Sequence, residues 1–472
     1  MDLTRGPILK SVVLFALPLL GSSLVQQLYS TVDLLFVGNV LGTEAAAGLG
    51  VSVLLVTCLV GFFTGVSVGV TVLVGKLVGA GDDDAVGRAV HVAVTLALVG
   101  GAVFAVVGWL FSPAYIALMA TPVGAAAEAL LYLRVYFVSF VAVVLYNMCA
   151  GVLRAFGDSR APLVAQFVGG VLNVAMNALF LMVLELGIAG TALATLVSQG
   201  VAAALLVRHL AKADGPVRLR LSGLTLRGGM VRPILAVGVP TGLQSTVITL
   251  SNVLVQWQIN LLGTVPMAAF TSYFKVELPI YLVIVSVGQA ATAFVAQNVG
   301  AGLASRARKG ATLCLGVGVV STALLSAGLL AVGPWAFGLF GGDDAVVEKG
   351  VGIIAITFPF YWLYAVLEVL GAATRGHGRA VGPMVAVMVN ICLVRTVLVA
   401  GLMHVAPGVG SVAVSYPASW ATAAACMAVC YWLAVRPTRG KVAERARGGA
   451  AGGLRANPSD GAPGETATGM AS

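Results

Sequence analysis

A single carboxylate stands inside a long apolar stretch near the start of the sequence. Asp33 lies in a run from about 8 to 41 whose only other charge is at its edge. An ionised Asp in the middle of a membrane-spanning helix costs roughly 2.5–3.5 kcal/mol. Three polar residues precede it on the same helical face: Gln26, Tyr29 and Ser30. A carboxylate on such a stripe is suited to bind and release a cation, so the stripe should face a water-filled cavity or another polar helix.

A second polar face lies between residues 162 and 184. Its members recur at helical spacing: Gln166, Gly170, Asn173 and Asn177. The amides either join two helices, at typically under ~1 kcal/mol per contact, or supply oxygens that help Asp33 hold a small cation. We take Asp33, Asn173 and Asn177 as the candidate cation-coupling set. Their hard oxygens could ligate Na⁺, or Asp33 alone could carry one proton.

Other polar residues in apolar runs are candidates for substrate binding or coupling: Thr195, Gln256, Glu277, Tyr364 and Glu368. The two glutamates either form structural ion pairs, such as Glu368 with Arg395, or attract a cationic substrate. Tyr364 offers either cation–π surface or an anchor at the membrane interface. Pro18 removes a backbone hydrogen bond from the first helix. It causes either a static curve or a bend that follows protonation of Asp33.

The helices that position these residues belong to a membrane protein. Hydrophobic residues make up 59% of the chain and charged residues 10%, whereas a soluble domain carries about 25% charged residues. The net charge of +9 follows membrane topology and does not indicate a nucleic-acid partner. All six Cys lie in apolar runs and are expected to be reduced packing residues. The four dispersed His form no metal or nucleophile–base spacing, so we expect neither cofactor nor enzyme activity.

Twelve apolar segments alternate with short polar connections, which predicts twelve transmembrane helices. Their approximate ranges are 8–41, 46–78, 86–111, 129–153, 162–184, 187–208, 233–262, 267–299, 310–339, 350–373, 383–403 and 410–435. Lys and Arg gather in alternate connections and in the long connection 209–232. We therefore expect a multi-pass protein of the inner (plasma) membrane. The positive-inside rule then places both of its termini on the cytoplasmic side. The first run is too long for a cleavable signal.

The sequence repeats itself at a spacing of 221 residues. Four places share this register: Val78–Gly81 with Val299–Gly302, Arg154, Gly157 and Pro162 with Arg375, Gly378 and Pro383, Gly42 and Thr43 with Gly263 and Thr264, and Gly187 with Gly408. We therefore predict an all-α protein with two six-helix bundles, 1–210 and 233–436, joined by a cytoplasmic linker, 211–232. Because each half has an even number of helices, the pseudo-two-fold axis runs along the membrane normal. The Gly-, Ala- and Arg-rich tail 437–472 is predicted to be disordered.

The motifs also match a family in order and spacing over residues 8–436. The chain resembles the multidrug and toxic compound extrusion (MATE) transporters in QQLYSTVDLLFVGNVLGTEAAAGLG, LRAFGDSRAPLVAQFVGGVLNVAMNALFL, GIAGTALATLVSQ, FVAQNVGAG and TRGHGRAVGPM. The resemblance is closer to the DinF-like than to the NorM-like branch. In that branch an Asp is common where this chain has Asn177. The second half has Leu254 where the repeat places the equivalent of Asp33, so coupling should be centred on the first half.

The resemblance implies a secondary active antiporter that works by alternating access. It would export cationic amphipathic drugs or toxins in exchange for H⁺ or Na⁺, surrounded by membrane lipid, and would function as a monomer. An alternative is a lipid-linked precursor flippase of the same wider superfamily, although such proteins usually add helices or line the cavity with several basic residues. A channel is a third class, which an exchange assay separates from an antiporter.

Overall fold

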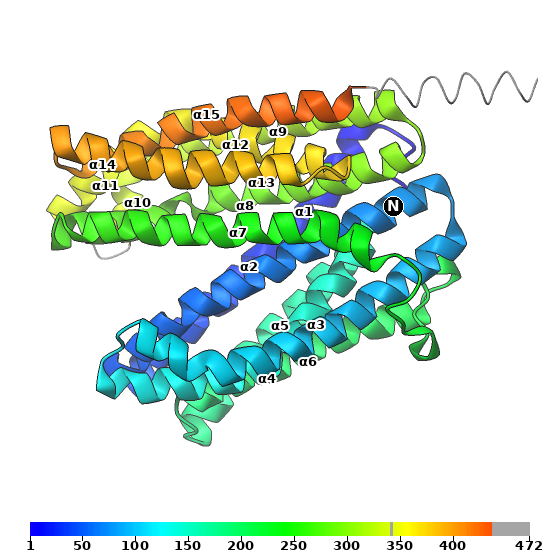
Figure 1. The fold of residues 1–472 in the computed structure, drawn as a ribbon. Coiled ribbons are helices and arrows are strands. Elements are labelled where there is room, and N and C mark those ends of the chain that lie inside the picture. Colours follow the sequence, from blue (N-terminus) through cyan, green and yellow to red (C-terminus); the bar gives the residue numbers. More distant parts are fainter. Residues whose placement is uncertain (340–342, 437–472) are drawn as a thin grey trace, which may run out of the picture. The chain divides into compact units, whose positions relative to one another are not determined.

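The computed structural model describes residues 1–339 and 343–436, which form a helical protein (Figure 1). The tail 437–472, predicted to be disordered, lies outside the described residues. The first half contains α1 (Ile8–Phe36), η1 (Val37–Leu41), α2 (Thr43–Ala80), α3 (Asp83–Leu118), α4 (Val123–Ala155), α5 (Arg160–Asn177), η2 (Ala178–Val183) and α6 (Ile188–Lys212). The linker forms two short turns, η3 (Gly215–Val217) and η4 (Leu221–Gly223). The second half contains α7 (Val231–Asn260), α8 (Thr264–Gly300), α9 (Ala304–Ala331), α10 (Gly333–Gly338), α11 (Asp344–Thr357), η5 (Phe358–Phe360), α12 (Tyr361–Gly376), α13 (Val381–Val387), η6 (Met388–Val394), α14 (Arg395–Val405) and α15 (Val409–Val435).

Twelve helical stretches of the described residues are long and apolar enough to cross a membrane. Several are assembled from shorter elements, because proline and local π-helical turns interrupt the regular hydrogen bonding. The tenth, Asp344–Gly376, joins α11 and α12 through the proline-containing turn η5. The fold class predicted from the sequence, an all-α polytopic membrane protein with twelve transmembrane helices, is confirmed.

The 221-residue spacing reappears in the backbone conformation. Three of the four repeated positions have glycines with positive φ in both halves: Gly42 and Gly263 (86° and 103°), Gly81 and Gly302 (71° and 73°), and Gly157 and Gly378 (73° and 84°). Side chains are strained in this region, so glycine is required where the chain turns from one helix to the next. The repeated glycines therefore mark equivalent turns.

The buried apolar residues form separate cores that largely follow the two halves. One cluster includes Phe140 and Met148 and is built mainly from the first half, whereas another includes Phe270 and Trp420 and is built from the second. Helix α1 is the exception, because its first part around Phe15 packs with residues of α8, α9 and α12. Beyond Pro18, α1 runs against α5. Helix α1 thus contacts the second half before the proline and the first half after it.

The two halves touch along α2, which lies beside α7 and α8 (Figure 1). A Cβ atom added at Gly65 would collide with the backbone of Gly242, and one at Gly69 with the carbonyl of Ile234. Small residues let membrane helices approach this closely. These contacts lie toward the face of the protein that carries residue 1, which also holds the ends of α2, α4, α8 and α12. We call it the residue-1 face.

Candidate functional site

The structure brings together the three residues that the sequence proposes for cation coupling. Asn177 Nδ2 donates to Asp33 Oδ1 at 2.6 Å, and also to the main-chain oxygen and Oδ1 of Asn173 at 3.0 and 3.2 Å. All three side chains are buried, with exposed fractions of 9% for Asp33, 1% for Asn173 and 0% for Asn177. One residue comes from α1 and two from α5, so the cluster depends on the packing of these helices.

Both helices that carry this cluster change from α-helix to π-helix next to it. Helix α1 changes to the π-helical η1 at Val37, one turn after Asp33, and α5 changes to the π-helical η2 directly after Asn177. Such π-helical turns are frequently found at functional sites. Gly170 lets the helices approach, since an added Cβ would stand 2.9 Å from the Val25 side chain. The backbone therefore positions the Asp33 carboxylate against the two amides.

The cluster contains a carboxylate without an ion pair and buried polar atoms without hydrogen bonds within the described residues. Within the described residues Asp33 forms no ion pair, so no side-chain charge compensates an ionised carboxylate there. Among the described residues, the buried Asn177 Oδ1 accepts no hydrogen bond and the buried Asn173 Nδ2 donates none. Buried polar atoms are costly unless they are paired. A proton on Asp33 would neutralise the carboxylate. Na⁺ held by the carboxylate and the amide oxygens would also neutralise it and would give Asn177 Oδ1 a partner, because Na⁺ is a hard cation that suits oxygen ligands.

The polar stripe on α1 divides into an inward and an outward part. The Tyr29 hydroxyl accepts a hydrogen bond from Gln199 Nε2 of α6 at 3.2 Å. Gln26 and Ser30 are exposed, and the Ser30 hydroxyl donates to the main-chain oxygen of Gln26 at 3.0 Å. Tyr29 and Asp33 therefore point toward neighbouring helices. Sequence reasoning missed Gln199, although it ends the family-like motif on α6.

Thr195 and Gln256 make contacts within their own helices. The Thr195 side chain is 5% exposed, and its hydroxyl donates to the Thr191 carbonyl at 3.2 Å. Gln256 Nε2 donates to Asn260 Oδ1 at 2.8 Å on α7. These geometries give Thr195 a helix-internal bond and place Gln256 on α7, away from the α1–α5 contact.

Glu277 lies in an aromatic environment in the second half. Its Oε2 accepts a hydrogen bond from the Tyr361 hydroxyl at 3.0 Å. The Tyr361 and Tyr364 rings lie 4.8 and 5.8 Å from the Trp420 ring, centroid to centroid. Aromatic faces beside a carboxylate form a surface that attracts cations. Tyr364 therefore belongs to a ring cluster, and Glu277 stands at its edge.

Glu368 forms an ion pair, which was one of its two alternatives, but Arg395, the partner suggested as an example, is wrong. Glu368 Oε1 accepts from Arg375 Nη2 at 2.6 Å, two turns along the same helix. Arg395 instead donates from Nε to Ser419 Oγ at 3.1 Å and stands over the Tyr416 ring at 4.4 Å. The sequence suggested an ion pair between helices, but α12 carries both partners of the pair.

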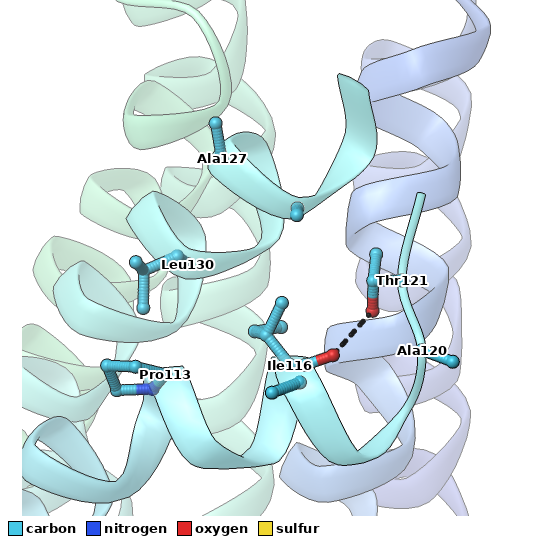
Figure 2. A pocket seen from close by; sticks show the side chains of 8 residues that line it. Pro113, Ile116, Ala120, Thr121, Ala127 and Leu130 are labelled. Carbon is cyan, nitrogen blue, oxygen red and sulfur yellow. Dashed lines mark hydrogen bonds between the residues drawn. The ribbon is translucent and has the colours of Figure 1, made fainter. Parts of the chain in front are cut away.

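A small surface pocket lies apart from these groups, at the turn between α3 and α4 (Figure 2). Its lining is mostly apolar, with Pro113, Ile116 and Leu130 among the side chains. The Thr121 hydroxyl donates to the Ile116 carbonyl at 3.2 Å within the turn. The lining side chains include no ionisable group, so the pocket offers no coupling chemistry.

The chain is similar to known proteins in sequence and in fold. The MatE family model matches residues 18–179 and 240–400. Probable multidrug resistance protein YpnP of Bacillus subtilis (strain 168) is 30% identical over 308 residues, covering 64% of this chain and 67% of YpnP. Probable multidrug resistance protein YoeA of the same organism is 26% identical over 426 residues, covering 89% of this chain and 92% of YoeA. The fold matches the outward-facing structure of a multidrug resistance MATE family transporter of the MOP superfamily, with a TM-score of 0.86 and 20% identity over 92% of this chain and 97% of that chain. This chain therefore belongs to the MATE family of transporters.

Proposed function

We propose that the protein is a secondary active antiporter that exports cationic amphipathic compounds in exchange for H⁺ or Na⁺, with Asp33 as the coupling group. The observation that carries this proposal is a buried carboxylate in a membrane-spanning helix whose hydrogen-bond partner is an amide. Burying an uncompensated charge is unfavourable. Asp33 should therefore hold a proton or Na⁺ whenever its surroundings are dry.

The exchange arises because the cationic substrate and the coupling ion compete for the single negative charge of Asp33. With Asp33 ionised, the site can attract a cationic substrate or a coupling ion, and one monovalent cation neutralises the carboxylate. Release of one proton or Na⁺ from Asp33 can then balance the export of one monovalent cation. Alternating access completes the cycle if the site opens to one side of the membrane at a time.

The distribution of acids supports coupling in the first half. Asp33 is buried, whereas the repeat places the exposed Leu254 at the equivalent position of α7. This asymmetry favours the DinF-like branch of the family. We propose Asn173 and Asn177 as neutral ligands or hydrogen-bond partners of the coupling ion, and Pro18 as the position where α1 bends. Glu277, with its aromatic neighbours, is a second candidate group for attracting cationic substrate.

The proposed orientation follows the basic connections. The residue-1 face carries Arg88, Arg160 and Arg308 beside the helix ends, so we place it, with both termini, in the cytoplasm. The protein would act as a monomer in the inner (plasma) membrane. With this orientation, the close contacts of α2 with α7 and α8 at the residue-1 face correspond to a transporter that is closed toward the cytoplasm.

Export of a fluorescent organic cation such as ethidium from vesicles tests the proposal, with pH and Na⁺ gradients imposed separately. We expect one gradient to drive export and Asp33→Asn to abolish it while insertion stays normal. Asp84→Asn, an exposed acid at the start of α3, is the matched control and should retain export. Export that ignores both gradients would refute coupling. Full export by Asp33→Asn would move the coupling site, with Glu277→Gln the next variant to measure.

A further inference from the structure

Among the hydrogen bonds that cross between the halves at the residue-1 face, two are related by the internal repeat. Gln297 Nε2 near the end of α8 donates to the Ala155 carbonyl at the end of α4, at 2.6 Å. Lys76 Nζ near the end of α2 donates to the His377 carbonyl just after α12, at 2.8 Å. Gln297 and Lys76 are 221 residues apart. In this pair of hydrogen bonds, each half places a side chain against the end of a helix in the other half.

The backbone of α2 and α8 meets at the same place. A Cβ added at Gly79 would collide with the Gln297 carbonyl, and one added at Gly300 would collide with the Lys76 carbonyl. These glycines are also 221 residues apart. Only a hydrogen atom fits at each position, so the two helices cross at the repeat axis in direct backbone contact. Lys76 and Gln297, which donate the two side-chain hydrogen bonds, also supply the main-chain carbonyls at this crossing.

The segment before α1 occupies the remaining side of Gln297. The Leu3 N–H donates to Gln297 Oε1 at 3.1 Å, and the Leu3 carbonyl accepts from Asn298 Nδ2 at 3.1 Å. The Leu3 side chain is 1% exposed and joins the cluster that contains Phe15 and Phe294. The Gln297 amide is thus bonded at both ends, to Leu3 on one side and to α4 on the other.

We propose that Lys76 and Gln297 are positioning residues that hold the residue-1 face closed, and that the segment 1–6 fixes Gln297 in this role. The inference rests on the proposed function, because a contact that holds one face closed matters only if that face opens during transport. Both side chains donate to main-chain carbonyls at helix ends. They therefore couple the position of whole helices, while the coupling ion binds elsewhere, at Asp33.

His377, whose carbonyl accepts the hydrogen bond from Lys76, also has a titratable ring close to this contact. Its ring is largely buried, and burial, together with the charges of Lys76, Arg379 and Arg308, lowers the pKa of this imidazole to about 4. The Tyr431 ring is its aromatic neighbour, 6.3 Å away. His377 is therefore neutral near pH 7. Lys76 then donates to the main chain beside an uncharged ring.

Single substitutions should shift the balance between the two transport states. A hydrogen bond contributes about 0.5–1.5 kcal/mol, so its loss changes an equilibrium constant by roughly twofold to tenfold. Gln297→Met and Lys76→Met should each raise the ratio of open to closed residue-1 face by that factor, and the double variant should raise it further. Lys76→Gln is the conservative variant, since glutamine serves at the repeat-related position. Arg88→Met, at an exposed basic residue of α3, is the matched surface control.

Spin-label distances on both faces measure this ratio in the full-length chain in vesicles, with the native cysteines replaced. The label pairs use exposed positions: Asp84 with Ser305 on the residue-1 face, and Ala120 with Ala406 on the opposite face. In the two Met variants, the first distance should lengthen and the second should shorten in a larger share of molecules. Lys76→Gln should resemble the unsubstituted chain. A loosened fold without gating would broaden both distances together, and would overturn the proposal.

The outcomes separate this inference from the proposed function. If the unsubstituted chain alternates between two distances as pH or Na⁺ is changed, but both Met variants show its distributions, the positioning role is refuted and alternating access stands. If the unsubstituted chain keeps one distance on each face under every gradient, alternating access is refuted, and with it the positioning role. Deletion of residues 2–6 tests whether this segment fixes Gln297. It should increase the fraction of molecules with an open residue-1 face, as Gln297→Met does.

Discussion

Breaking the Glu368–Arg375 pair should destabilise the protein more than removing both charges. The contact is 2.6 Å long, and the side chains are 18% and 6% exposed. Leaving one partner of a buried pair without the other typically costs about 3–5 kcal/mol, whereas replacing both with apolar residues is often close to neutral. Arg375→Met should therefore lower the free energy of unfolding strongly, and Glu368→Leu should do so as well. The double variant should recover most of the loss.

A double-mutant cycle turns this expectation into a number. Unfolding of the detergent-purified protein, followed by denaturant or heat, should give an interaction energy between the two sites that approaches the sum of the two single losses, because the double variant recovers most of both. Export of a cationic dye by the double variant decides what the pair does. Normal export would identify the pair as structural. Additive effects on stability would refute the reasoning from burial, and a stable double variant without export would show that Glu368 takes part in transport.

Three further predictions concern other contacts. His377 titrates below its ordinary pKa, so the stability it contributes is complete above about pH 6.5 and is lost as pH falls toward 4, by at most about 3 kcal/mol; His377→Asn should flatten that part of the curve of unfolding free energy against pH, and an unchanged curve would contradict it. Tyr29→Phe removes the acceptor of the Gln199 amide and should cost about 1–3 kcal/mol; equal thermal stability of the two proteins would show that Gln199 finds another partner. Gly65→Ala places a methyl group against the backbone of α7 and should lower stability by about 1–3 kcal/mol, whereas Gly50→Ala on the same helix, with open space around it, should be neutral or stabilising by up to about 1 kcal/mol.

The candidate cation-coupling residues show what the spacing along a helix can predict about a site and what it cannot. The intervals between Gln166, Asn173 and Asn177 predict one face of α5, and all three side chains are buried. Their spacing cannot show which helix they face, because that depends on the packing of α1 and α5. The same limit explains Gln26 and Ser30, which share a helical stripe with Asp33 but remain exposed. The polar stripe on α1 is wider than the contact between α1 and α5, so the residues at the edge of the stripe remain exposed.

The partner of Glu368 illustrates a second limit. The sequence offered Arg395 on another helix as an example of an ion-pair partner, yet Arg375 reaches the glutamate from two turns away on α12. Only the coordinates show that Arg395 stands over Tyr416. Long flexible side chains make such pairings a result of the tertiary structure.

The sequence alone determined the features that depend on composition and on periodicity along the chain. Apolar length predicted twelve helices because a membrane core requires a minimum span, and the 221-residue spacing marked turns that need glycine with positive φ. Tertiary structure decided which polar groups meet. Asp33 contacts Asn177 across 144 positions, and Leu3 contacts Gln297 across 294. Such contacts depend on how helices rotate and cross, which the pattern along one helix does not specify.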